Sequence, residues 1–296
     1  MIEGELKVIS QAWEFQKEAG IAERPVSIEK YLRVMGAELK FRDDLRDDEA
    51  GQVLQFGSRL IIVVNARHPI ERQRFTVLHE IAHIRLNLPS SHSKSTSVEQ
   101  LLGYSKRPRE EILCDLFAAE CLLPRNFFQV DVRSRDCSFA TVQELAELYQ
   151  SSLAATGSRF AAYNTMPCCW VLADEKYVRY ASCSSALRSA GFFLKIGIEI
   201  PRASVLGRLR DGAKGIRPGV AEVVPGHVWI HDDCTSIEEF TEAAIISTQA
   251  RQGVALLTSE LSSEHDHNEK ISEDDEDILL AELDGQLRFP GKRRRR

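Results

Sequence analysis

The segment from Arg74 to His83 constrains the fold of this chain more than any other. His79 and His83 are four residues apart, so on a helix they share one face and both imidazoles can reach a single metal ion. Glu80 is rotated away from His79, where its carboxylate can contact a metal-bound water without ligating the metal. Apolar residues at helical spacing support the helix, and a proline closes it: Phe75, Leu78, Ala82, Leu86 and Pro89. The alternative is an amphipathic helix that happens to contain two histidines.

A catalytic zinc ion usually has three protein ligands, so a third has to come from elsewhere in the chain. The extended pattern HExxHxxGxxH is excluded, because Leu86 and Pro89 occupy its glycine and histidine positions. A second predicted helix, bounded by prolines at 108 and 124, offers Glu111, with Glu110 as the competing candidate on another face. Asp115 lies one turn beyond Glu111 and can orient a ligand imidazole by a hydrogen bond. Alternatively, the two glutamates are solvated charges that suit the first turn of a helix.

These two motifs together resemble the ImmA/IrrE family of metallopeptidases over roughly residues 1–128. The first is RQRFT followed by HEIAH at 72–83, and the second is ExxCDxFAAxxLLP at 111–124. The family commonly has alanine where Cys114 stands, which leaves the ligand positions untouched. The resemblance implies a thermolysin-like, gluzincin-type peptidase domain with Glu111 as the third ligand. It also implies a substrate, a helix-turn-helix repressor of the xenobiotic-response-element type, whose cleavage releases transcription. In one branch of the family this drives a radiation and desiccation response, and in another it controls a mobile element.

The residue types predict a hydrolytic mechanism. Zinc, with Mn²⁺ or Fe²⁺ as alternatives, would lower the pKa of its bound water from about 15.7 to about 7. Glu80 would accept the proton of that water and return it to the leaving amine. Attack of water on a peptide carbonyl produces an oxyanion that a polar side chain can stabilise. The sequence offers three candidates for this role and does not choose among them: Arg74, His92 and Tyr104. The competing hypothesis is a non-proteolytic regulator with a structural zinc ion and a ligand- or partner-binding C-terminal domain. Glu80 favours the peptidase over this regulator, because a structural zinc site needs four ligands and no general base.

The chain divides into an α+β arrangement of four predicted parts: a peptidase domain at 1–128, a helical connector at 129–165, a GAF-like α+β domain at 166–261 and a disordered charged tail at 262–296. In the first part we expect helices at 4–19 and 27–36, then strands at 38–41, 52–56 and 60–64. The apolar run at 60–64 predicts a strand buried on both faces.

The connector has two predicted helices, at 138–149 and 153–160, separated by a short turn, which is similar to a helix-turn-helix unit. Residues 125–160 contain four basic and four acidic side chains, so their net charge is zero. Proteins that bind DNA concentrate lysine and arginine, because phosphate contacts dominate their affinity. We therefore expect a structural or substrate-docking unit, and direct DNA binding is disfavoured.

In the C-terminal part we expect a hairpin at 170–180, strands at 192–198, 223–224 and 227–231, and helices at 203–211 and 238–247. This layout resembles a GAF-like domain, a fold that can bind small molecules or serve as a protein-contact surface. His227 and His231 would share one side of a strand, and without a third ligand we interpret them as exposed strand residues. His265 and His267 fall in the predicted tail.

Composition excludes several classes of function. The formal net charge is −6, and no apolar run approaches the roughly 18 residues of a membrane span. The N-terminus lacks the basic region and apolar core of a signal peptide. The seven cysteines form no CxxC pair, which favours reduced thiols. We expect a cytoplasmic protein that does not associate with membranes.

Overall fold

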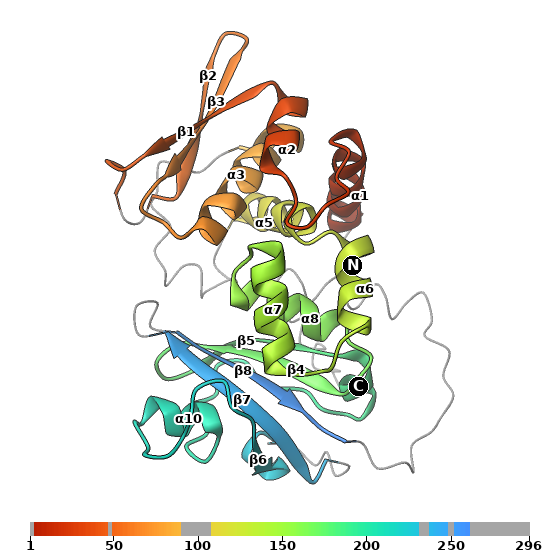
Figure 1. Ribbon diagram of the computed structural model, residues 1–296, viewed down its shortest axis with the longest axis vertical. Coiled ribbons are helices and arrows are strands. Elements are labelled where there is room, and N and C mark those ends of the chain that lie inside the picture. Colours follow the sequence, from red (N-terminus) through yellow and green to blue (C-terminus); the bar gives the residue numbers. More distant parts are fainter. Residues whose placement is uncertain (1–2, 47–48, 90–107, 231–236, 248–251, 261–296) are drawn as a thin grey trace, which may run out of the picture.

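A computed structural model describes residues 3–46, 49–89, 108–230, 237–247 and 252–260 (Figure 1). Within these ranges the fold is mixed α+β, with a three-stranded sheet near the start of the chain and a five-stranded sheet near its end. Helices lie between the two sheets in Figure 1. Among the described residues, no helix is long and apolar enough to cross a membrane.

The first sheet has the order β1-β3-β2, with β3 parallel to β1 and antiparallel to β2. Its strands are β1 (Ala37–Arg42), β2 (Gly51–Phe56) and β3 (Arg59–Asn65). Successive side chains of a strand point to opposite faces, and those of β3 are buried from Ile61 to Asn65. The prediction of a central strand covered on both faces is therefore confirmed.

The helices that share a core with this sheet are α1 (Glu3–Glu18), α2 (Ile28–Met35), α3 (Ile70–Arg85) and α5 (Arg109–Leu122). Ser27 caps α2 by accepting a hydrogen bond from the Lys30 N–H, and Gly36 ends it at a φ of 61°. One core joins β3 to these helices through buried side chains that include Ile62, Val64, Val77, Leu78 and Phe117. This core fixes α3 and α5 against each other.

Three helices follow: α6 (Arg125–Arg133), α7 (Phe139–Tyr149) and α8 (Leu153–Tyr163). The last two confirm the predicted helix pair, and each begins with a serine cap, Ser138 or Ser152. The sequence analysis missed α6. The boundary predicted after residue 128 falls inside this helix, and the division into domains itself remains a prediction.

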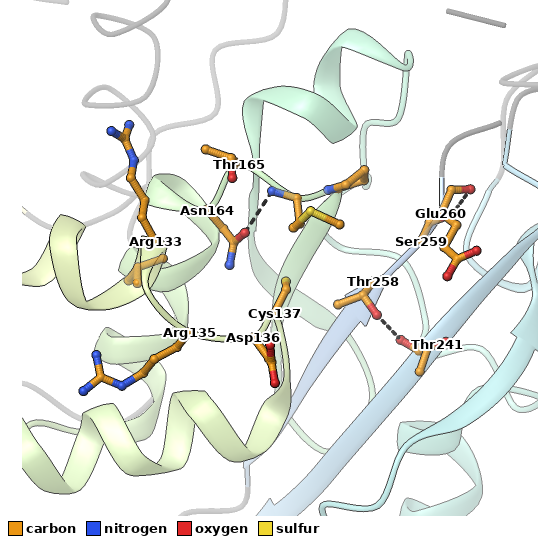
Figure 2. A pocket seen from close by; sticks show the side chains of 13 residues that line it. Arg133, Arg135, Asp136, Cys137, Asn164, Thr165, Thr241, Thr258, Ser259 and Glu260 are labelled. Carbon is orange, nitrogen blue, oxygen red and sulfur yellow. Dashed lines mark hydrogen bonds between the residues drawn. The ribbon is translucent and has the colours of Figure 1, made fainter. Parts of the chain in front are cut away.

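The second sheet has the order β5-β4-β8-β7-β6, and every neighbouring pair is antiparallel. Its strands are β4 (Cys168–Ala173), β5 (Val178–Cys183), β6 (Glu222–Pro225), β7 (Glu239–Ser247) and β8 (Gln252–Thr258). One face, through Trp170 and Leu256, packs against α6, α7 and α8. The other face packs against α9 (Ser185–Ser189) and α10 (Val205–Arg210). A cavity of about 480 Å³ opens between the end of α6 and strands β7 and β8 (Figure 2).

Three of the elements predicted in this part are wrong. Residues 238–247 form strand β7 rather than a helix. Residues 192–198 form no strand, although Phe192 and Leu194 are buried in the core. Residues 226–228 form a 3-10 helix, η2 (Gly226–Val228), instead of the start of a strand. His227 is exposed there, and His231 lies outside the described residues, as do the predicted tail and its two histidines.

Candidate metal centre

Helix α3 presents two histidines on one face, as the sequence predicts. The helix is anchored by Val77, Leu78 and Ile81, which are at most 2% exposed and pack into the core on its other side. His79 and His83 are 9% and 4% exposed, so both imidazoles are held in place by their surroundings. Their Nε2 atoms are 3.2 Å apart, and the two ring planes are inclined by 74°. The two nitrogens therefore converge on one point.

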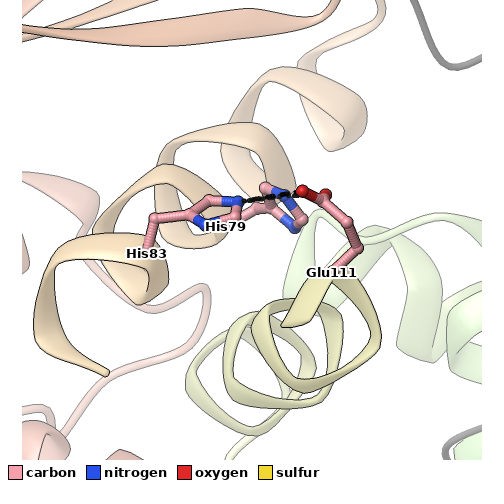
Figure 3. A group of neighbouring side chains, drawn as sticks. All are labelled: His79, His83 and Glu111. Carbon is pink, nitrogen blue, oxygen red and sulfur yellow. Dashed lines mark hydrogen bonds and ion pairs between the residues drawn. The ribbon is translucent and has the colours of Figure 1, made fainter. Parts of the chain in front are cut away.

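Glu111 reaches the same point from helix α5 (Figure 3). Its carboxylate oxygens lie 3.2 Å from the Nε2 of His79 and 3.6 Å from the Nε2 of His83. Ligand atoms at about 2.1 Å from a tetrahedral zinc ion would be about 3.4 Å from one another. The three donors thus match the edges of one face of such a tetrahedron. These three buried residues could hold a metal ion, and all their ligand atoms lie within 4.8 Å of one another.

Asp115 contacts the opposite nitrogen of His79. Its Oδ1 is 2.8 Å from the Nδ1 of that ring, so the carboxylate accepts the Nδ1 proton and leaves Nε2 facing Glu111. Burial alone would lower the pKa of His79, but its hydrogen bonds to Asp115 and Glu111 outweigh burial and raise the pKa to about 10. A metal ion would therefore displace a proton from His79 when it binds.

Glu80 directly follows the first histidine and is 1% exposed. Its negative charge contributes to the raised pKa of His79, which places the carboxylate within electrostatic reach of the centre. Glu80 is thus a buried acid that lies next to the converging group in sequence and does not belong to it.

The structure shows where some of the other candidate site residues lie, namely the competing third ligand and one of the three candidates for stabilising the oxyanion. Glu110 is partly exposed and does not belong to the converging group, whereas Glu111 does. Arg74 donates a 2.7 Å hydrogen bond to the carbonyl oxygen of Val26, which directs this side chain towards the segment before α2. His92 and Tyr104 lie outside the described residues.

Two histidines one turn apart, a glutamate from a second helix and an acid beside the first histidine define the class of site that metal-dependent peptidases use. The comparison with known families agrees. Residues 33–161 match the Peptidase M78 model, described as the IrrE N-terminal-like domain. The chain thus contains a domain of this family, and the resemblance drawn from the two motifs is confirmed.

A solved structure extends the similarity beyond this domain. A transcriptional regulator from Mycobacterium tuberculosis superposes with a TM-score of 0.54 at 11% sequence identity, covering 86% of this chain and 76% of that chain. At this identity the likeness concerns the fold alone. Among curated proteins, none matches the chain.

Proposed function

We propose that this protein is a zinc-dependent endopeptidase that cleaves a helix-turn-helix repressor and so derepresses stress-response or DNA-damage-response genes. The observation that carries the proposal is the convergence of His79, His83 and Glu111 on one buried point, with Glu80 beside it. Within the described residues this group has three members, which leaves a fourth coordination position for water or substrate. A structural zinc site would fill that position with a fourth side chain.

Each residue has a separate role in the proposed reaction. His79, His83 and Glu111 hold the ion, and Asp115 fixes the ring of His79. Bound zinc supplies a Lewis acid that makes water acidic enough to ionise near neutral pH. Glu80 accepts the proton of the attacking water and returns it to the nitrogen of the leaving amine. The burial of Glu80 limits competition from bulk solvent for this proton.

The substrate class rests on the family. An IrrE N-terminal-like domain spans residues 33–161, and repressor cleavage is what the resemblance to this family implies. The helices α7 and α8 carry no excess of positive charge, which favours a role in packing or substrate docking over DNA binding.

The fold supports the two finer assignments in the same proposal. A histidine-bearing helix packed on a small mixed sheet, with the glutamate on a following helix, supports a thermolysin-like, gluzincin-type peptidase. The five-stranded antiparallel sheet with helices on both faces supports a GAF-like C-terminal domain.

The test compares protein N-termini in cells that express this chain or its Glu80→Gln variant, before and after DNA damage. Glutamine keeps the size of the side chain and removes the base, so the variant should keep its fold and its metal but lose cleavage. We expect a new terminus inside a helix-turn-helix protein only when Glu80 is intact. Equal cleavage by the variant would remove the mechanism. If neither metal-loaded protein cleaves, the non-proteolytic regulator with a structural zinc ion becomes the better account.

A further inference from the structure

The cavity between the end of α6 and the second sheet has the features of a binding site (Figure 2). Cys137 and Asn164 lie in the wall formed by the helices and their connections, and Thr241 and Thr258 lie in the wall formed by β7 and β8. Its volume of about 480 Å³ is within the range of pockets that bind small molecules, and far above the space of one water molecule.

Asn164 lines this cavity and carries a buried hydrogen-bond donor that has no partner among the described residues. The side chain is 6% exposed, and its Oδ1 accepts a 2.9 Å hydrogen bond from the Met166 N–H. That bond fixes the orientation of the amide, because only the oxygen can accept. The buried Nδ2 has no hydrogen-bond partner within the described part of the chain. Since an unsatisfied buried donor is costly, the cavity favours an occupant that brings a carbonyl or carboxylate oxygen.

Cys137 adds a thiol to the same wall. Six cysteines belong to the described residues; five are buried and Cys137 is the one with partial exposure. Its thiol lies close to that of Cys168 in strand β4, which is 0% exposed. A molecule that enters the cavity can therefore meet the Cys137 sulfur, whereas Cys168 is covered.

The charged residues of the lining are balanced. Two are basic, Arg133 and Arg135, and two are acidic, Asp136 and Glu260. A lining with balanced charges does not attract a polyanion. The threonine hydroxyl groups and the Asn164 amide in the walls do not suit an apolar ligand. A small zwitterion with amide and carboxylate groups, such as a short peptide, has the matching chemistry.

We propose that this cavity is an S-thiolation site, which binds one half of a small peptide disulfide and transfers that half to Cys137. The Cys137 thiolate attacks the nearer sulfur of the disulfide, a new sulfur–sulfur bond forms, and the old one breaks. The departing thiolate takes up the proton that Cys137 lost. The peptide disulfide is the oxidant, so no other co-reactant is needed. An oxygen of the bound half accepts the hydrogen bond from the Nδ2 of Asn164.

The experiment treats the full-length protein with oxidised glutathione and, separately, with 2-hydroxyethyl disulfide, which has the same reactive bond but no amide or carboxylate. Peptide mapping by mass spectrometry gives the rate of adduct formation at Cys137. The quantity compared is the ratio of the rate with oxidised glutathione to the rate with 2-hydroxyethyl disulfide. We expect this ratio to be higher at Cys137 than at the cysteine of an unstructured peptide. Asn164→Leu should lower this ratio about tenfold, which is the effect of losing one hydrogen bond. It should leave the rate with 2-hydroxyethyl disulfide unchanged. Cys137→Ser should abolish the adduct.

Two results would overturn the proposal. One is a reagent preference at Cys137 equal to that of the free peptide, and the other is an Asn164→Leu variant that slows both reagents equally. If Asn164→Leu does not fold, the preference of the unaltered protein relative to the free peptide decides the question without it. Neither readout depends on peptidase activity.

Discussion

Arg159 of α8 and Glu120 of α5 form an ion pair that is buried on both sides, with side chains 2% and 0% exposed. Glu120 also accepts a hydrogen bond from the indole nitrogen of Trp13 at 3.3 Å, and Arg159 donates to the hydroxyl of Tyr163. Burial opposes the charge of Arg159, but the nearby Glu120 carboxylate outweighs it and raises the pKa of the guanidinium. This pair connects the helix that carries Glu111 to the helices before the second sheet.

The first prediction concerns this pair. Arg159→Met should lower the free energy of unfolding by about 3–5 kcal/mol, because it leaves the Glu120 carboxylate buried without its partner. The double variant Arg159→Met with Glu120→Gln should lose clearly less, since no buried charge remains. Urea unfolding of both variants and the parent measures this. A single variant within about 1 kcal/mol of the parent would contradict the argument.

A second prediction concerns Gly157 in α8, at the contact with strand β4. A Cβ atom at this position would overlap the indole ring of Trp170, which is 0% exposed and stacks on Phe139. Alanine gains about 1 kcal/mol in helix propensity over glycine. Overpacking costs about 1–3 kcal/mol, so Gly157→Ala should be destabilising on balance.

Gly4→Ala in α1 is the matched control for this substitution. Its Cβ would meet only the terminal nitrogen of the Arg109 side chain, at 3.0 Å, and a flexible side chain can move. Thermal unfolding should show a lower midpoint for Gly157→Ala alone. An unchanged or raised midpoint for that variant would show that Trp170 moves aside at little cost.

The convergence of His79, His83 and Glu111 could be predicted from the sequence because each half of this group is local. The spacing of His79 and His83 defines one helix face, and the prolines at 108 and 124 bound the second helix. The choice between Glu110 and Glu111 required the structure, because adjacent helix positions differ by about 100° and only packing decides which one faces inward. Glu111 is the buried one, at 7% exposure.

Strand β7 shows why the second sheet was harder to predict. Its inward positions carry Phe240, Glu242 and Ala244, so a charged residue interrupts the alternation that indicates a strand. Glu242 is 0% exposed, and its carboxylate accepts 2.9 Å hydrogen bonds from the Trp229 indole and from the Leu206 N–H. Both partners are distant in sequence. The cavity beside β7 likewise combines residues of separate segments, which no local pattern connects.

A third prediction concerns Asp115. Asp115→Ala should weaken zinc binding by about 10–100-fold, because the ring of His79 loses the partner that fixes its tautomer and direction. Competition with a chromogenic chelator measures the apparent Kd. Glu110→Ala is the control, since this acid lies on the same helix outside the converging group. Equal losses in both variants would mean that Asp115 acts only through general electrostatics.

The final prediction concerns the pH dependence of stability through Asp131 in α6. Its side chain is 7% exposed and accepts hydrogen bonds from the Tyr149 hydroxyl at 2.6 Å and from the Arg24 guanidinium at 2.7 Å. Burial alone would raise the pKa of Asp131, but these hydrogen bonds and a further one from Arg135 outweigh it and lower the pKa. The folded state therefore binds this proton more weakly than the unfolded state does.

For a carboxyl group with a lowered pKa, the stabilisation is complete above the unfolded pKa of about 3.9 and is lost as pH falls through the folded pKa. Asp131→Asn should thus be less stable than the parent by about 1.5–3 kcal/mol at neutral pH, and the difference should shrink below about pH 4. Urea unfolding of both proteins between about pH 7 and about pH 3 measures it. Asp136→Asn, at an exposed neighbouring acid, should show little difference throughout. A difference for Asp131→Asn that stays constant with pH would mean that its hydrogen bonds stabilise the fold independently of its charge.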